Sequence, residues 1–215
     1  DVVHAHNIPS ALAMKNVSGK KILSLHGIYS QQIDDLHGRI YSNISKNYED
    51  KALKWADVIT AVSKEACDYY SKNGHNVLHV PNAIDLNNLP KKATKKFEKQ
   101  IIFAGRLSKE KGIEILLETV TNLPDNYHLL IAGSGPLEEK VRNMAAKKTN
   151  VHYLGYQSKH NTISLIRGSD LLVQPSIIEG ISSTLLEAMG CGTCILASNI
   201  EGIREIVENE KIGEI

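Results

Sequence analysis

Short runs of apolar, mostly β-branched residues alternate along the chain with longer stretches in which apolar residues recur every three or four positions. The first pattern predicts buried strands and the second predicts amphipathic helices. In the first half we expect strands at Val2–Ala5, Lys21–Leu25, Val58–Val62 and Asn76–Val80, with helices at Arg39–Trp55 and Lys64–Lys72. In the second half we expect strands at Ile101–Ala104, His128–Ala132, Val151–Leu154, Leu171–Gln174 and Ile195–Ser198, and helices at Gly112–Asn122, Leu137–Lys147, Lys159–Gly168, Ile181–Gly190 and Gly202–Val207. Strands that alternate with helices are typical of an α/β fold with parallel sheets.

A polar and basic segment, Asn87–Lys96, separates the two halves and shows no apolar period. We interpret it as a solvated interdomain linker, with attraction of its lysines to a membrane surface as the alternative. The sequence therefore predicts two domains, residues 1–92 and residues 93–215. The five strands expected in the second domain predict a Rossmann-like sheet, in which ligands bind beyond the carboxyl ends of the strands.

The composition is that of an ordinary globular protein, with 42% hydrophobic residues, 23% charged residues and a net charge of +1. This balance offers no extended field for binding nucleic acid. The three cysteines do not form a disulfide framework, so we expect a reducing compartment. The chain begins inside an expected strand and ends without a closing element, which predicts a fragment whose N-terminal domain is incomplete.

Charged residues and glycines follow the first two expected strands of the second half. Gly105 allows a tight turn, Arg106 can hold a diphosphate with its planar guanidinium, and Lys111 adds a charge beside a helix start. A solvated basic turn is the alternative. After the next strand, Gly133 and Gly135 give only part of a dinucleotide-binding fingerprint, so we expect them to pack against a nucleotide rather than to bind NAD.

A third loop follows the strand that ends at Gln174 and carries Glu179. The helix after it is expected to open near Ser182, where free backbone amides can hold a phosphate. These amides belong to Gly180, Ile181, Ser182 and Ser183. Glu187 lies about 9 Å further along the helix axis. A nucleotide-sugar presents sugar hydroxyls, phosphates and ribose hydroxyls over a similar length, although two glutamates at this spacing also occur by chance.

This loop and helix, Pro175-Ser-Ile-Ile-Glu179-Gly-Ile-Ser-Ser-Thr-Leu-Leu-Glu187, resemble the signature of the family-four retaining glycosyltransferases. The segment Gly105-Arg-Leu-Ser-Lys-Glu-Lys-Gly112 resembles a second motif of that family. Three further segments match in the family's order: Asp57–Ser63, Val80–Asp85 and Glu201–Val207. The resemblance covers nearly the whole chain and implies the GT-B fold, which has two Rossmann-like domains.

The resemblance also implies roles for single residues. Arg106 and Lys111 would hold the donor diphosphate, Glu179 would face the donor sugar, and Glu187 would bind the ribose hydroxyls. His26 follows the strand Lys21–Leu25, where the family has a histidine that faces the reacting sugar. We therefore expect His26 and Glu179 to be catalytic, with a satisfied loop histidine as the alternative for His26.

The expected activity is transfer of a sugar from a nucleoside-diphosphate sugar to a hydroxyl of a glycan or lipid acceptor, with retention of anomeric configuration. The alternatives are a nucleotide-sugar epimerase of the same fold and a non-catalytic sugar-nucleotide-binding protein. By analogy with polysaccharide and glycolipid synthesis, we expect a cytoplasmic enzyme that associates peripherally with a membrane and does not bind nucleic acid.

No metal or other cofactor is expected, since the family does not require a divalent ion. His4 and His6 share one face of a strand but have no evident third ligand. Cys191 and Cys194 have the spacing of a redox or zinc motif, yet no second Cys or His pair completes it. We interpret these cysteines as small buried side chains.

Overall fold

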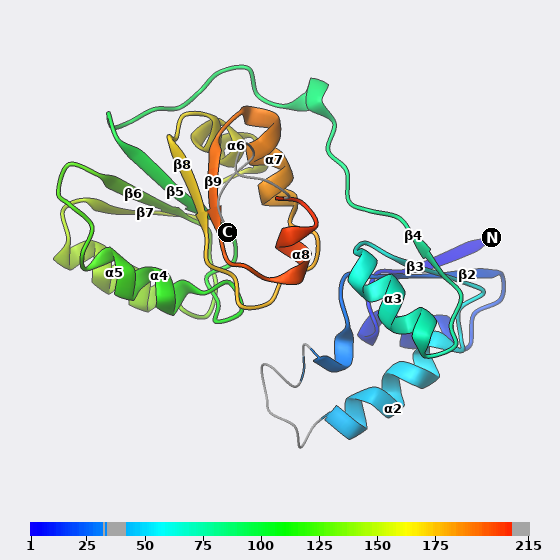
Figure 1. Ribbon diagram of the computed structural model, residues 1–215. Coiled ribbons are helices and arrows are strands. Elements are labelled where there is room, and N and C mark those ends of the chain that lie inside the picture. Colours follow the sequence, from blue (N-terminus) through cyan, green and yellow to red (C-terminus); the bar gives the residue numbers. More distant parts are fainter. Residues whose placement is uncertain (32, 34–41, 208–215) are drawn as a thin grey trace. The chain divides into compact units, whose positions relative to one another are not determined.

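The computed structural model describes residues 1–31, 33 and 42–207. The chain divides into two compact units, Asp1–Asn82 and Ala83–Ile215, each built around a parallel sheet (Figure 1). The predicted α/β fold with two parallel sheets is therefore confirmed. The division lies ten residues before the boundary that we expected after residue 92.

The N-terminal unit is a four-stranded sheet in which strands consecutive along the chain are also neighbours in space. The strands are β1 (Val2–Ala5), β2 (Lys20–Leu25), β3 (Val58–Ala61) and β4 (Val77–His79). They are connected by the 3-10 helix η1 (Pro9–Met14) and the helices α2 (Ser42–Leu53) and α3 (Lys64–Lys72). The predicted helix Arg39–Trp55 begins outside the described residues, and η1 was not predicted.

One face of this sheet forms the core of the N-terminal unit. Side chains alternate between the faces of a strand, and Leu23, Leu25, Ile59 and Ala61 are the buried set of β2 and β3. Apolar residues of η1, α2 and α3 pack against this set. The connections therefore cover the same face of the sheet.

The C-terminal unit is a five-stranded parallel sheet in the order β7-β6-β5-β8-β9. The strands are β5 (Gln100–Ala104), β6 (His128–Ala132), β7 (Val151–Gly155), β8 (Leu171–Gln174) and β9 (Cys194–Ala197). The chain moves outward from β5 to β7 and then returns to the other side of β5. This reversal creates a switch point between β5 and β8, the position at which α/β sheets bind ligands.

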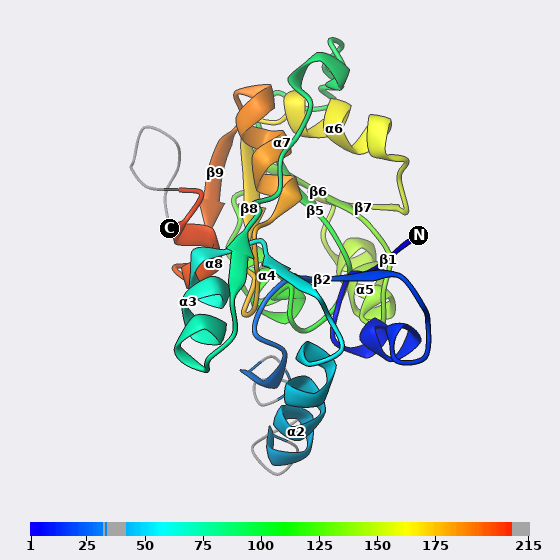
Figure 2. The ribbon, with the colours of Figure 1, turned by 90° about the vertical axis from the view of Figure 1, so that its right-hand side faces the viewer.

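Helices cover both faces of the C-terminal sheet, with α4 and α5 on one face and α6 and α7 on the other (Figures 1 and 2). Their bounds are α4 (Ile113–Val120), α5 (Glu138–Lys147), α6 (Lys159–Arg167), α7 (Ser183–Cys191) and the short α8 (Glu201–Arg204). α7 begins two residues later than predicted because Ser182 is extended and caps the helix. None of the helices in the described ranges has the length and apolar character needed to cross a membrane.

The lysine-rich segment before β5 is held against the C-terminal unit near both of its ends, while its lysines are exposed to solvent. It contains the 3-10 helix η2 (Leu86–Asn88), and Leu89 is buried. A β-carbon on Gly190 of α7 would contact the side chains of Leu89, Ile84 and Leu86. The apolar spacing of Ile84, Leu86 and Leu89 was not recognised in the sequence because lysines follow it closely.

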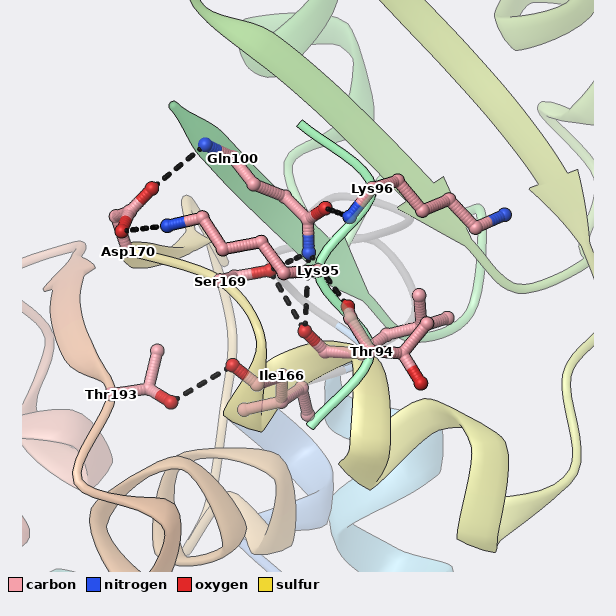
Figure 3. A network of polar contacts seen from close by, with 9 residues as sticks. Thr94, Lys95, Lys96, Gln100, Ile166, Ser169, Asp170 and Thr193 are labelled. Atoms are coloured by element: carbon pink, nitrogen blue, oxygen red, sulfur yellow. Dashed lines mark hydrogen bonds and ion pairs between the residues drawn. The ribbon is translucent and has the colours of Figure 1, made fainter. Parts of the chain in front are cut away.

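The end of the segment is held by a network around the fully buried Gln100 (Figure 3). The Gln100 side-chain amide donates to the Thr94 carbonyl at 3.2 Å, and its oxygen accepts from the Lys96 N–H at 2.7 Å. Asp170 accepts from the Gln100 N–H at 2.8 Å and from Lys95 Nζ at 2.6 Å. The network ties the segment to the amino ends of β5 and β8.

A pair of histidines lies on neighbouring strands of the same sheet. His128 Nδ1 and His152 Nε2 are 3.1 Å apart, and the ring of Phe97 stacks on both imidazoles. Burial, followed by the charges of His128 and Lys96, lowers the pKa of His152. The folded chain therefore favours the neutral form of this imidazole more than the unfolded chain does.

A lowered pKa of His152 makes stability depend on pH. Below about pH 6.5 the unfolded chain takes up a proton that the folded chain resists, so the stability contributed by the neutral form is lost as the pH falls. We predict that the free energy of unfolding in urea decreases between about pH 7.5 and about pH 5.5 and that His152→Gln reduces the decrease. The exposed His160→Gln is the control, and an equal pH dependence in all three proteins would contradict the prediction.

Candidate functional site

A pocket of about 480 Å³ opens at the carboxyl edge of the C-terminal sheet. Backbone and side chains that follow β5, β6 and β7 line it together with one threonine each from α6 and α7. The lining residues are Ala104, Gly105, Arg106, Ala132, Gly133, Ser134, Gly135, Pro136, Tyr156, Gln157, Thr162 and Thr184. The pocket thus brings together Gly105, Arg106, Gly133 and Gly135, which the sequence analysis had selected from two separate loops.

The glycines of this pocket let two loops pack backbone against backbone. A β-carbon on Gly133, where φ is +147°, would lie 1.8 Å from the Gly105 carbonyl oxygen. A β-carbon on Gly135 would lie 2.6 Å from the Leu107 carbonyl oxygen, and the Leu107 N–H donates to the Ser134 carbonyl at 2.9 Å. Gly133 and Gly135 therefore pack against the neighbouring loop, and neither adds a side chain to the pocket.

Glu179 is the acceptor of a polar cluster that joins the loops after β5 and β8. Its Oε2 accepts from Lys111 Nζ, from Gln174 Nε2 at 2.8 Å and from Ser176 Oγ at 3.3 Å. The Glu179 side chain is 12% exposed and forms an ion pair with Lys111. Two residues predicted from separate motifs thus contact each other.

Gln174, which the sequence analysis did not select, connects this cluster to α7. It is the buried last residue of β8, and its Nε2 also lies 2.9 Å from Ser182 Oγ. Ser182 Oγ in turn caps α7 by accepting from the Leu185 N–H at 3.5 Å. The signal that could have selected Gln174 from the sequence is a polar residue at the end of an apolar strand.

The residues between Glu179 and α7 are supported from α8. A β-carbon on Gly202 would lie 2.4 Å from the carbonyl oxygens of both Glu179 and Gly180. Ile181 is buried next in the chain, and Ser183 is the first residue of α7. The backbone that carries Glu179 is therefore fixed on one side by Gly202 and on the other by the helix.

Arg106 and Glu187 differ in their freedom to reach a ligand. The Arg106 side chain is 67% exposed, and its Nη1 lies 3.9 Å from Glu110 Oε1. Glu187 is buried on α7, where its Oε1 lies 3.4 Å from Lys159 Nζ. Glu187 stands one helical turn after Thr184, which lines the pocket, but Glu187 itself is not among the lining residues.

His26 belongs to the N-terminal unit and follows β2 directly. Its ring centroid is 5.9 Å from that of His6, which is 4.1 Å from that of His4. Partial burial, then the charges of His6 and His4, lowers the pKa of His26. In the ranges that the structure describes, no three His, Cys, Asp or Glu residues form a group that could hold a metal ion. Cys191 and Cys194 are free thiols, and Cys194 is exposed rather than buried.

Residues 86–215 match the family model described as glycosyl transferases group 1, and residues 1–88 match that of glycosyltransferase family 4. The chain therefore belongs to the glycosyl transferases group 1 family. An uncharacterised glycosyltransferase of Methanocaldococcus jannaschii is 25% identical over 243 residues, which cover 99% of the chain and 61% of the relative. The phosphatidyl-myo-inositol mannosyltransferase of Mycobacterium leprae is 26% identical over 234 residues, which cover all of the chain and 59% of that enzyme. The glycosyltransferase chain thus spans about three fifths of the length of these relatives.

Solved structures show the same fold. Sucrose-phosphate synthase from Thermosynechococcus elongatus superposes with a TM-score of 0.81 at 18% identity, over 99% of this chain and 59% of that one. HepE of Anabaena, solved in complex with UDP-glucose, superposes with a TM-score of 0.76 at 19% identity, over 97% and 62% of the two chains. The glycosyltransferase therefore has the GT-B fold predicted from its sequence.

The contact of Gly202 with the Glu179 loop predicts a large effect of a small substitution. Gly202→Ala places a methyl group against two carbonyl oxygens, so we expect a loss of about 1–3 kcal/mol in the free energy of unfolding in urea. Gly105→Ala is the matched control because its β-carbon would meet only the Phe103 ring, at an ordinary 3.5 Å. Equal stability of the two variants would show that Gly202 does not support the loop.

Proposed function

We propose that this glycosyltransferase moves a sugar from a nucleoside-diphosphate sugar to a hydroxyl of a glycan or lipid acceptor, with retention of anomeric configuration. The observation that carries the proposal is one edge of the C-terminal sheet, where Arg106 lines a glycine-floored pocket and the loops beside it hold Lys111 and Glu179 together. The UDP-glucose complex of HepE supports a nucleotide-sugar donor. The M. leprae relative, a mannosyltransferase named for phosphatidyl-myo-inositol, supports a lipid acceptor.

In this proposal the donor diphosphate lies between Arg106, Lys111 and the start of α7. Arg106 is exposed and weakly paired, so its guanidinium can turn toward the phosphates. The Lys111 ammonium has three N–H donors and can contact both Glu179 and a phosphate oxygen. These charges stabilise the departing diphosphate, and the reaction needs no divalent metal ion for that purpose.

The nucleobase lies in the part of the pocket lined by Tyr156 and Gln157. Tyr156 is 77% exposed, although large aromatic side chains normally bury most of their surface. Its flat ring can stack on a base. Gln157 Nε2 donates to the Leu154 carbonyl at 2.7 Å, which leaves its amide oxygen to accept an N–H of the base.

The sugar lies beside Glu179, and we assign a catalytic role to His26 of the N-terminal unit. The bond from C1 to the diphosphate oxygen breaks while the acceptor oxygen bonds to C1 on the same face, and the acceptor proton passes to the departing diphosphate. Glu179 orients the sugar with Oε1, because its three described donors all contact Oε2. Attack of Glu179 on C1 to form a covalent intermediate is the alternative route to retention.

Calorimetric titration with UDP, GDP and ADP tests the donor site. We expect one of the three to bind, and Arg106→Ala to weaken its binding at least about tenfold, the loss of one charge-assisted hydrogen bond. Arg142→Ala is the control, since Arg142 also pairs with a glutamate four residues away but lies outside the pocket lining. Binding of equal strength in both variants would remove Arg106 from the site, and a folded chain that binds none of the three would contradict the proposal.

We expect substitution of Glu179 to lower turnover and substitution of Glu187 to weaken nucleotide binding. Glu179→Ala should lower the release of nucleoside diphosphate from UDP-glucose, GDP-mannose or ADP-glucose by about a hundredfold or more. It should bind the nucleotide at least as tightly as the parent, because Lys111 loses its carboxylate partner. Glu187→Ala should instead weaken nucleotide binding, measured by the same titration. Full turnover and full binding in both variants would refute the assignment of the two carboxylates.

A further inference from the structure

The N-terminal unit contains a carboxylate, Glu49 of α2, that is only 1% exposed. Its Oε1 accepts a hydrogen bond from the hydroxyl of Tyr70 on α3 and, at 3.4 Å, one from the backbone N–H of Ser30. The hydroxyl oxygen of Tyr70 accepts from the N–H of Tyr29 at 3.3 Å. Two side chains from two helices thus hold two consecutive backbone amides, those of Tyr29 and Ser30, where a helical turn begins directly after one loop.

That loop is the one that carries His26. It begins at Leu25, whose carbonyl accepts from the Val62 N–H at 3.1 Å, and Ile28 is buried within it. His26 therefore lies between two fixed points, the end of β2 and the amide of Tyr29, with only three residues from 26 to 28 between them. A span this short retains few backbone conformations.

The buried pair Glu49 and Tyr70 fills the space between α2, α3 and β2 at a cost in free energy. Burial of a carboxylate costs free energy unless hydrogen bonds compensate for the lost water, and apolar side chains of similar volume would fill the space without that cost. Buried polar groups can instead specify a single arrangement of the backbone around them. Burial, then the charge and hydrogen bond of Glu49, raises the pKa of the Tyr70 hydroxyl far above its usual range, so it remains a donor.

We propose that Glu49 and Tyr70 are positioning residues that hold the His26 loop in the arrangement required for sugar transfer. Neither side chain acts on the substrate. Each acts through the backbone at residues 29 and 30. The inference rests on the proposed role of His26.

Tyr70→Phe tests the pair because it removes only the hydroxyl that bridges Glu49 and Tyr29. We expect the Tyr29 amide to exchange with solvent on the order of tenfold faster, measured by NMR. We also expect the titration midpoint of the His26 Cε1–H signal, assigned with His26→Asn, to rise toward its ordinary value. Partial burial and the neighbours His6 and His4 now lower that midpoint, and a loosened loop reduces all three effects.

Two further variants complete the test. Glu49→Gln keeps the acceptor oxygen, so it should preserve both NMR measurements if the role is positional. Tyr48→Phe is the matched control, because the Tyr48 ring packs edge-on against Trp55 and its hydroxyl has no described contact with the loop. An unchanged His26 midpoint and an unchanged Tyr29 exchange rate in Tyr70→Phe would overturn the proposal.

Turnover separates this proposal from the proposed function. We expect Tyr70→Phe to release nucleoside diphosphate from the donor on the order of ten- to a hundredfold more slowly, with the KM for the donor nearly unchanged. An inactive His26→Asn beside a fully active Tyr70→Phe would overturn the positioning role alone. A fully active His26→Asn would show that His26 takes no part in the reaction and would also refute the positioning role of Glu49 and Tyr70.

Discussion

The ion pair between Lys111 and Glu179 is the contact on which the proposed donor site depends. It joins the loops after β5 and β8, the two strands at which the order of the sheet reverses. An ion pair that is mostly withdrawn from water is costly, and the donors on Gln174 and Ser176 offset part of that cost. With the pair formed, the site presents little net charge. In the proposed site, a diphosphate that reached Lys111 would compete with Glu179 for it, which would link phosphate binding to the freedom of the carboxylate.

Backbone contacts keep these loops close enough for that pair to form. The carbonyls of Gly105 and Leu107 occupy the space that side chains would need at residues 133 and 135, and Gly202 performs the same function behind Glu179. Because these contacts are between backbone atoms, no rotation of a side chain can relieve them. The polar side chains of the site therefore project from a scaffold with little room to shift, as a preorganised electrostatic site requires.

The alternation of apolar segments was sufficient to predict both sheets, because strand and helix periodicity is a local property of the chain. The family motifs selected Glu179 and Lys111 separately, but spacing along the chain says nothing of contacts between loops, so their ion pair was not foreseen. Tyr156 was missed since a single exposed aromatic after a strand has no pattern around it. The contact of the segment before β5 with α7 was not predicted because its lysines outweigh Leu89 in any average of polarity. The roles expected of the site residues, Arg106, Lys111 and Glu179 as well as His26 and Glu187, stay predictions.

The docking of that segment also fixes where halves of related enzymes can be exchanged. A donor-binding module joined within the lysine-rich run would lose Leu89 from its place against Gly190, and one that stopped before α8 would lose the support of the Glu179 loop. The natural junction for a chimera is the peptide between Asn82 and Ala83. Residues 83–207 then stay together as one part, and the proposed donor site can be exchanged separately from residues 1–82.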